Sequence, residues 1–347
     1  MKHSLLLYAL RTWAGKKAPL SLVCLCLTAT TAVAQQIPQY SQYLINGMLV
    51  NPAYTGYRET GYAQVFYHNQ WMQAGTPQYF AFAIDGHLAN GTNVGLAFSD
   101  ERMGALAINS VAAAYAYRLR FDRADLSFGL SLGAKYYSLD YSTLRPFQPV
   151  DPVIQSLRNR WTPDLNIGVY YGSSVFYAGL SARNITDGRI LGGQVIDDFI
   201  IPLSTWNAVL TAGFSIPLSE RLTFRPSLMW QDDFAAPSHI DLTAALLFFD
   251  RFWVGLCFRT DQPFGKNESW GTLNELYSGA VMTEIFVTNQ MTLSYAFDFG
   301  LNQDSYKYFG GHEIAIGYYF ARKVDSRYNR RYRYNKYRTD GVCDFCP

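Results

Sequence analysis

The feature that most constrains how this chain can fold is a regular alternation of large apolar residues with small or polar ones. Residues 291–299 read Met-Thr-Leu-Ser-Tyr-Ala-Phe-Asp-Phe, so the odd positions are large and apolar while the even positions are small or polar. Residues 126–136, 222–230 and 312–320 follow the same rule. Successive side chains of a β-strand point to opposite faces of its sheet, so the alternation predicts strands with two chemically different faces.

About fourteen segments with this pattern lie between residues 61 and 320, and many approach the roughly 9–11 residues with which a tilted strand crosses a bilayer. After residue 34, no apolar run reaches the roughly 18 residues that a membrane helix needs. The predicted strands are 61–68, 78–88, 93–100, 105–119, 124–137, 163–171, 174–182, 204–215, 221–231, 238–248, 251–260, 275–286, 290–299 and 311–320.

Two architectures compete for this pattern, a soluble β-sandwich and a membrane barrel. A soluble sandwich turns its large apolar face inward and covers its outside with charged residues. Here only 16% of the residues are charged, and the face opposite the large apolar one is mostly Gly, Ala, Ser and Thr. Small residues can line a polar lumen, which leaves the large apolar face to lipid and the terminal aromatic residues to the membrane interfaces. The pattern favours an all-β fold, a transmembrane antiparallel up-and-down β-barrel over residues 61–320.

The connections between the predicted strands alternate in length. The short ones, of five residues or fewer, are 89–92, 120–123, 172–173, 216–220, 249–250 and 287–289. The others are longer, apart from 101–104. Outer-membrane barrels have short periplasmic turns, longer external loops and periplasmic termini. We therefore expect the chain in a bacterial outer membrane, in contact with its lipid, with both mature termini in the periplasm.

Residues 1–34 have the composition of an export signal. Four basic residues are followed by the apolar stretch 18–33, and Ala32-Val33-Ala34 forms an A-x-A cleavage site before Gln35. A membrane anchor is the alternative, but the apolar stretch is short and contains three threonines. We expect a signal peptide that is removed, so that the mature chain lies outside the cytoplasm.

Residues 321–347 form a basic, Arg/Tyr-rich segment with eight Lys/Arg and three acidic residues, although the whole chain has a formal net charge of only +2. Interleaved arginine and tyrosine can bind nucleic acid, but a periplasmic tail meets acidic protein surfaces, lipid phosphate or cell-wall polymer instead. We expect no nucleic-acid partner, and a solvated tail is the alternative. The candidate interface residues of the tail are Arg330, Arg331, Arg333 and Tyr334.

Charged residues also occur on the predicted lumen face, and the candidates are Lys135, Arg225, Glu284 and Glu313. Opposite charges across a lumen can brace the barrel or set ion selectivity. Bracing is the more ordinary role. An open lumen would instead make the chain a transport barrel for a small hydrophobic or ionic solute. The pattern does not decide whether residues 35–60 or 138–162 plug the lumen.

The sequence carries no constellation that points to catalysis. It has no P-loop and no dinucleotide-binding glycine motif, and its histidines are not paired at metal-ligand spacing. His312, the one histidine of the last strand's apolar face, is expected to be an interfacial residue. Cys343 and Cys346 form a lone C-x-x-C, which favours a disulfide or free thiols over a metal site. We expect no enzyme activity and no catalytic, cofactor or metal site.

Residues 35–60 precede the first predicted strand and have no clean period. They contain Pro38-Gln39-Tyr40-Ser41-Gln42-Tyr43, then Asn46, then Asn51-Pro52-Ala53-Tyr54-Thr55-Gly56. This segment resembles the N-terminal signature of the PorP/SprF family, outer-membrane proteins of the type IX secretion and gliding-motility machinery of Bacteroidetes. The signature covers about nineteen residues, and the barrel pattern extends the resemblance to about residue 320.

The resemblance implies a barrel that acts with the periplasmic ring proteins and lipoproteins of the type IX secretion machinery and with an exported adhesin or other secreted substrate. Residues 35–60 would then be a periplasmic N-terminal segment that docks to those partners. The candidate interface residues are Gln42, Tyr43, Asn46, Asn51, Pro52, Tyr54 and Gly56. The structural alternative is that this segment packs under or into the barrel mouth, with a turn at Asn51-Pro52 and a positive φ at Gly56.

Overall fold

A computed structural model describes residues 47–58, 60–70, 76–140, 159–186, 206–219, 221–234, 237–249, 251–262, 264, 277–301 and 310–320. The predictions for the export signal, the first part of the family signature, the basic tail and the C-x-x-C lie outside the described residues. The candidate interface residues among them are Gln42, Tyr43, Asn46, Arg330, Arg331, Arg333 and Tyr334.

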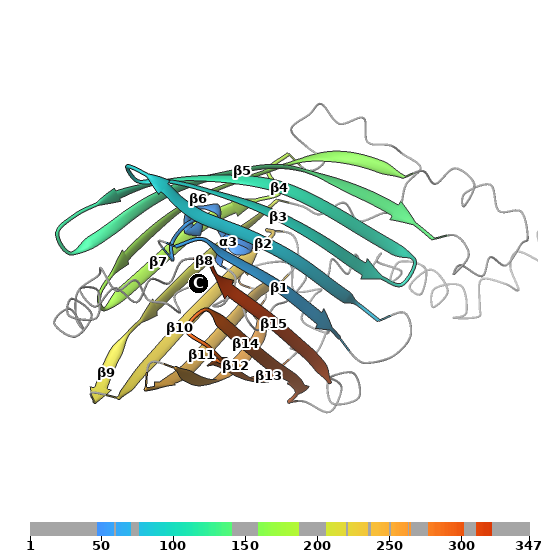
Figure 1. The fold of residues 1–347 in the computed structure, drawn as a ribbon. Coiled ribbons are helices and arrows are strands. Elements are labelled where there is room, and N and C mark those ends of the chain that lie inside the picture. Colours follow the sequence, from blue (N-terminus) through green and yellow to red (C-terminus); the bar gives the residue numbers. More distant parts are fainter. Residues whose placement is uncertain are drawn as a thin grey trace, which may run out of the picture. The chain divides into compact units, whose positions relative to one another are not determined.

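One antiparallel sheet closes on itself to form a barrel (Figure 1). Strands that are neighbours in the sequence pair with each other, except β8 and β9, and β1 pairs with β15 to close the ring. The strands are β1 (Tyr62–Asn69), β2 (Gln78–Ala89), β3 (Thr92–Met103), β4 (Leu106–Arg120), β5 (Ala124–Leu139), β6 (Arg160–Ser173), β7 (Phe176–Arg183), β8 (Asn207–Phe214), β9 (Ile216–Ser219), β10 (Leu222–Asp232), β11 (Ser238–Phe248), β12 (Phe252–Gln262), β13 (Tyr277–Phe286), β14 (Met291–Gly300) and β15 (Gly311–Tyr319).

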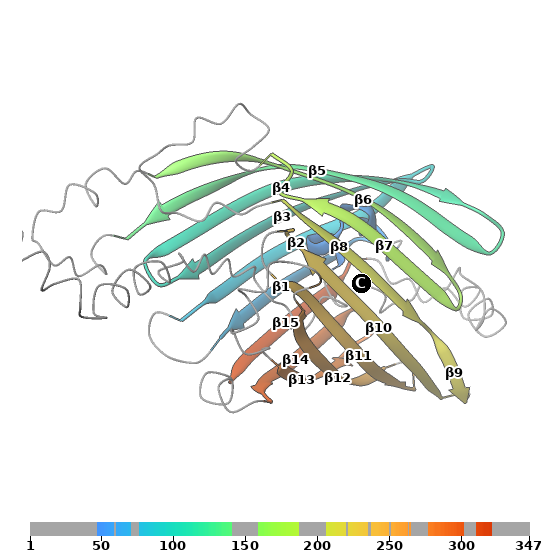
Figure 2. The same ribbon diagram turned by 180° about the vertical axis from the view of Figure 1, so that it is seen from behind.

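The barrel has fourteen strand positions around its ring, as the alternation predicts. β8 and β9 both pair with β10 and are separated only by Ser215, so together they fill one place (Figure 2). The predicted turn at 216–220 is wrong, because residues 216–219 continue the strand. The pairs on either side of the break, Ser227–Gly213 and Phe224–Ile216, flank Pro226 of β10, which has no amide hydrogen for the ladder.

The burial pattern confirms which face of each strand is apolar and outward. In β14, Thr292, Ser294, Ala296 and Asp298 are buried, whereas Leu293, Tyr295 and Phe297 are exposed. A sheet that shows its large apolar residues on the outside is stable only against lipid. Among the described residues, no helix is both long enough and apolar enough to span a membrane.

The connections at the two ends of the barrel differ in length. The end at which β2, β4, β6, β9, β11 and β13 connect to the next strand has only short links, and we call it the turn end. The opposite end, the loop end, has the long links, except that β3 and β4 are joined by two residues. Gly104, in that link, has φ +59°, a conformation that a tight hairpin turn uses.

An arginine in place of Leu256 is expected to destabilise the barrel by about 2–4 kcal/mol, because Leu256 lies mid-strand on the lipid face of β12 and is 60% exposed. Equilibrium unfolding in lipid vesicles measures the change. The matched control is Leu301→Arg, just beyond the end of β14, which should cost about 0–1 kcal/mol. Equal costs at the two positions would contradict the assignment of the outer face to lipid.

Candidate functional site: the N-terminal plug and the lumen

Residues 47–58 lie inside the ring of strands, and we call this segment the plug. It contains α3 (Gly47–Val50) and η1 (Pro52–Tyr54), and residues 50–57 are all buried. η1 packs against β4, β5 and β6, and Figure 1 shows both short helices within the barrel. The chain's own N-terminal segment therefore fills part of the lumen.

Asn51 caps η1 and fastens the plug to two strands. Its Oδ1 accepts a hydrogen bond from the Ala53 amide at 2.9 Å, which satisfies a donor at the start of the short helix. Its Nδ2 donates to the carbonyls of Val169 on β6 and Leu180 on β7, at 3.1 and 3.4 Å. This position needs a side chain that both accepts and donates hydrogen bonds, and the asparagine amide does both.

Two glycines of the wall make room for the plug. A Cβ atom on Gly129 would collide with the backbone of Pro52 and Ala53, and one on Gly168 would collide with the side chain of Asn51. The two glycines are opposite each other in the β5–β6 pair. The alternation predicts that the small residues of this face line a polar lumen. At these positions their small size lets a second layer of chain approach the wall closely.

Two tyrosines of the plug make its aromatic contacts with the wall. The hydroxyls of Tyr54 and of Thr211 on β8 are hydrogen-bonded at 2.9 Å, and Tyr170 of β6 donates to Tyr57 Oη at 2.9 Å. The Tyr170 ring centre lies 4.5 Å from that of Tyr54 and 5.0 Å from that of Tyr57. Burial raises the pKa of Tyr57 to about 12 and that of Tyr54 well above its ordinary value, so both phenols keep their protons.

The plug ends in a turn that requires glycine. Gly56 has φ +66°, and a Cβ atom there would also collide with the side chain of Asn93. The Gly56 amide donates to Asp85 Oδ2 on β2 at 2.6 Å, and Thr55 Oγ1 donates to the Pro52 carbonyl at 2.8 Å. The residues of the Asn-Pro-Ala-Tyr-Thr-Gly motif thus either contact the wall of the barrel or fix the shape of the plug.

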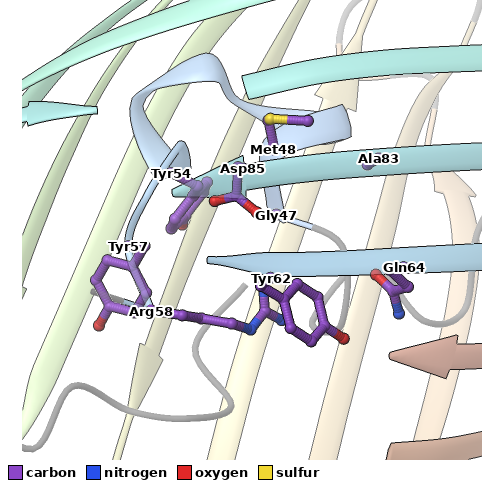
Figure 3. A pocket seen from close by; sticks show the side chains of 9 residues that line it. All are labelled: Gly47, Met48, Tyr54, Tyr57, Arg58, Tyr62, Gln64, Ala83 and Asp85. Atoms are coloured by element: carbon purple, nitrogen blue, oxygen red, sulfur yellow. The ribbon is translucent and has the colours of Figure 1, made fainter. Parts of the chain in front are cut away.

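Two arginines hold the junction between the plug and the wall. The Arg58 guanidinium lies 3.9 Å from the centre of the Tyr62 ring, where the chain passes into β1. Arg118 Nη1 of β4 donates to the Tyr57 carbonyl at 3.4 Å. Figure 3 shows Arg58 and Tyr62 at a small pocket that Asp85 also lines. Its cavity volume is about 10 Å³, room for about one water molecule.

The structure places the described residues of the predicted partner interface inside the barrel. Asn51, Pro52, Tyr54 and Gly56 are buried against the wall, so a partner would reach them only through the lumen or after movement of the plug. Their contacts correspond to the structural alternative, in which the segment packs into the barrel. Partner binding at these positions stays a prediction.

Two of the predicted lumen charges are basic, and both lie on the inner face of the wall. Lys135 Nζ contacts Asn184 Oδ1 and lies 3.5 Å from Asp164 Oδ1 on the neighbouring β6. Arg225 of β10 is opposite the buried Ala245 of β11, and its Nε and Nη1 atoms are buried. The contact between Lys135 and Asp164 braces two adjacent strands.

The two acidic lumen residues are both buried. Glu284 of β13 accepts a hydrogen bond from Trp253 Nε1 of β12 at 2.6 Å. Glu313 of β15 is 0% exposed and lies beside His68 of β1, with 4.0 Å between Oε1 and Nε2. Both contacts are made between neighbouring strands, and bracing by opposite charges across the lumen stays a prediction. A role of the four charges in ion selectivity stays a prediction.

A further charged cluster, on β11 and β12 at the loop end, was missed by the sequence analysis. His239 Nε2 lies 2.9 Å from Asp241 Oδ1, and its Nδ1 lies 2.7 Å from Asp261 Oδ1. Arg259 Nε donates to Asp241 Oδ1 at 3.0 Å. His239 is opposite Asp261 and Asp241 is opposite Arg259 in the β11–β12 pair. The alternation reveals the shared face of these residues, but only the register between strands reveals their contact.

A comparison with known sequence families identifies the family of this chain. The family described as type IX secretion system membrane protein PorP/SprF matches residues 32–318, which include the plug and nearly all of the barrel. The chain belongs to the PorP/SprF family. The resemblance seen in the N-terminal signature is thereby confirmed, and the protein is an outer-membrane barrel of the type IX secretion system. No curated protein matches the chain.

Several solved structures are similar to this PorP/SprF protein at low sequence identity. The Acinetobacter baumannii outer membrane protein Omp33 is 8% identical over 77% of this chain and 100% of its own, with a TM-score of 0.46. The Ralstonia pickettii toluene transporter TbuX is 11% identical over 80% and 94%, with a TM-score of 0.47. A mutant of the Rh. blastica porin is 11% identical over 75% and 99%, with a TM-score of 0.33. Likeness at this level carries no argument about function.

Valine in place of both Gly129 and Gly168 is expected to displace the plug of this PorP/SprF protein, because the new side chains take the space of its backbone and of Asn51. The purified double variant should then show conductance steps in planar bilayers, and the wild-type chain should show none. The matched control is Gly310→Ala, where a Cβ atom meets nothing within 4 Å. A folded double variant that stays silent would show that the plug is not what blocks the lumen.

Proposed function

We propose that this PorP/SprF protein is a non-enzymatic outer-membrane anchor of the type IX secretion apparatus. It couples the periplasmic ring proteins to the membrane and assists the export of specific surface proteins such as adhesins. The observation that carries the proposal is the plug, which occupies part of the lumen through which a transport barrel would pass its solute.

Several strands of the consecutive run β2–β8 hold the plug. Hydrogen bonds join it to β2, β4, β6, β7 and β8, including one from Ser181 Oγ to the Val50 carbonyl at 2.9 Å. A segment fixed to so many strands cannot leave the lumen without the loss of several buried hydrogen bonds at once. Such a barrel can bind partners at its two ends and on its outer surface.

The turn end is the end that we assign to the ring proteins. The chain enters β1 and leaves β15 at this end, so the basic tail begins there, directly after Phe320. Short turns are typical of the periplasmic side of outer-membrane barrels, which supports a periplasmic position for this end. The Arg/Tyr-rich tail has the charge to bind an acidic partner surface.

The surroundings of His312 agree with a non-enzymatic role. Its Nδ1 lies 2.7 Å from Tyr295 Oη on the outer face, and its ring centre lies 5.1 Å from that of Phe297. An amphipathic histidine among aromatic side chains suits a membrane interface. A lipid-cleaving role would predict lipolysis by the purified protein that His312→Ala abolishes.

A tagged chain extracted from its native outer membrane in mild detergent is expected to bring periplasmic ring proteins or lipoproteins and an exported adhesin with it, as identified by mass spectrometry. Alanine at Arg330, Arg331, Arg333 and Tyr334 should reduce the recovery of ring proteins several-fold, because the tail loses three positive charges and an aromatic ring. The barrel itself should remain folded, which heat modifiability in gel electrophoresis reports.

The matched control removes positive charge from the same end of the barrel without touching the tail. Arg221 and Arg251 are exposed beside turns of the turn end, so the double variant Arg221→Ala, Arg251→Ala should leave recovery unchanged. Recovery of the barrel alone, in several detergents, would contradict the anchor. Unimpaired export of all surface adhesins in a deletion strain would contradict the export role.

The transport alternative makes the opposite prediction for the wild-type chain. It expects ion conductance in planar bilayers, altered by Arg225→Ala or Glu284→Ala, because these charges face the lumen. With the plug in place we expect the wild type and both variants to be silent. Steady wild-type conductance that changes with either variant would favour the transport alternative over the anchor.

A further inference from the structure

One buried histidine and two buried carboxylates meet where the barrel closes. His68 lies on β1, Asp298 on β14 and Glu313 on β15, and they are 6%, 4% and 0% exposed. Glu313 is directly opposite His68 in the β1–β15 pair that completes the ring. Strands from both ends of the barrel sequence thus bring a nitrogen ligand and two oxygen ligands together at the loop end.

The distances between these groups suit a single metal ion. His68 Nε2 lies 3.6 Å from Asp298 Oδ2 and 4.0 Å from Glu313 Oε1, and the three ligand atoms all lie within 4.8 Å of one another. Atoms bound to one tetrahedral zinc ion at about 2 Å are about 3.3 Å apart. Small side-chain rotations therefore bring the three atoms to coordination distance.

The Nε2 atom of the His68 imidazole lies in this space, buried and without a hydrogen-bond partner among the described residues. A buried polar atom without a hydrogen bond is costly, so such an atom in a native structure calls for a ligand. A metal ion accepts the Nε2 lone pair, and the two carboxylates neutralise the charge of a divalent cation.

Gly311 keeps the space next to these ligands open. It is opposite Asp298 in the β14–β15 pair, and a Cβ atom on it would lie 3.1 Å from Asp298 Oδ2 and 3.3 Å from His68 Nε2. Both distances are shorter than ordinary contacts of a Cβ atom, so a side chain at this position would push against both ligand atoms.

We propose that His68, Asp298 and Glu313 bind one divalent transition-metal ion, most fittingly Zn²⁺, at the closure of the barrel. One imidazole and two carboxylates form a mixed nitrogen and oxygen set that zinc accepts, with the fourth position left to water. Calcium and magnesium take oxygen ligands instead. Arg259 Nη1 lies 4.0 Å from Asp298 Oδ1, the carboxylate oxygen that does not face His68. From this position Arg259 can orient the carboxylate.

The bound ion would stabilise the closed ring of strands. Its ligands come from β14, β15 and β1, so the full site exists only when β1 is paired with β15. A ligand that binds only the closed form stabilises that form. The proposal is independent of the proposed function in secretion, since it concerns the barrel alone.

The test uses the full-length protein in detergent, stripped of metal with EDTA and titrated with Zn²⁺ by calorimetry and with Co²⁺ by visible absorption. Cys343→Ser and Cys346→Ser are present throughout, because free thiols of a C-x-x-C pair would compete for zinc. We expect one tight site per chain, a tetrahedral Co²⁺ spectrum and a higher Tm with Zn²⁺. His68→Gln and Glu313→Gln should each weaken Zn²⁺ binding on the order of 100-fold.

Two controls separate this site from other histidines and from loss of the fold. His312→Gln removes the histidine next to Glu313 but on the outer face, and His239→Gln alters another lumen histidine; both should bind Zn²⁺ as the parent does. Gly311→Val keeps all three ligands yet fills the space beside them, and should also weaken binding. Unchanged affinity in a folded His68→Gln chain, or no tight site in the parent, would overturn the proposal.

Discussion

No water reaches the backbone inside a bilayer, so every amide and carbonyl of a spanning strand must find its partner within the protein. Closure of the sheet between β1 and β15 meets this requirement, with pairing from Tyr62 opposite Tyr319 to Asn69 opposite His312. The same closure brings the two ends of the barrel sequence together. It thereby creates the loop-end cluster of His68, Asp298 and Glu313, and it fixes the point at which the plug joins the wall.

The inner face of the wall is built to receive a second layer of chain. A ring of fourteen strands with small inward side chains leaves a lumen that those side chains do not fill. The plug fills part of this lumen, and it approaches the wall most closely where Gly129 and Gly168 lie side by side. Asn51, Tyr54 and Gly56 then satisfy their polar groups against wall residues, so the plug is bound by hydrogen bonds as well as by shape. A barrel filled in this way fits a protein that anchors and couples partners.

Most of the barrel could be read from the sequence, because period-two alternation is a local property. The strands, the lipid face and the short turns of one end followed from it, and the PorP/SprF signature named the family. The continuation of the eighth strand through Pro217 could not be read, because a proline in a strand depends on the pairing of its neighbour. The cluster of His239, Asp241 and Arg259 escaped for a similar reason, since its contacts depend on the β11–β12 register.

The sequence by itself determined that this chain forms an outer-membrane barrel, which side of each strand meets lipid and which family it belongs to. These properties are encoded in residues adjacent along the chain, so the alternation and the signature suffice. Only the tertiary structure decided that the signature residues Asn51, Pro52 and Tyr54 lie in the lumen, and that His68 meets Asp298 and Glu313 at the seam. Both depend on contacts between distant parts of the chain, such as Asn51 with Val169 and His68 with Asp298, which no local pattern encodes.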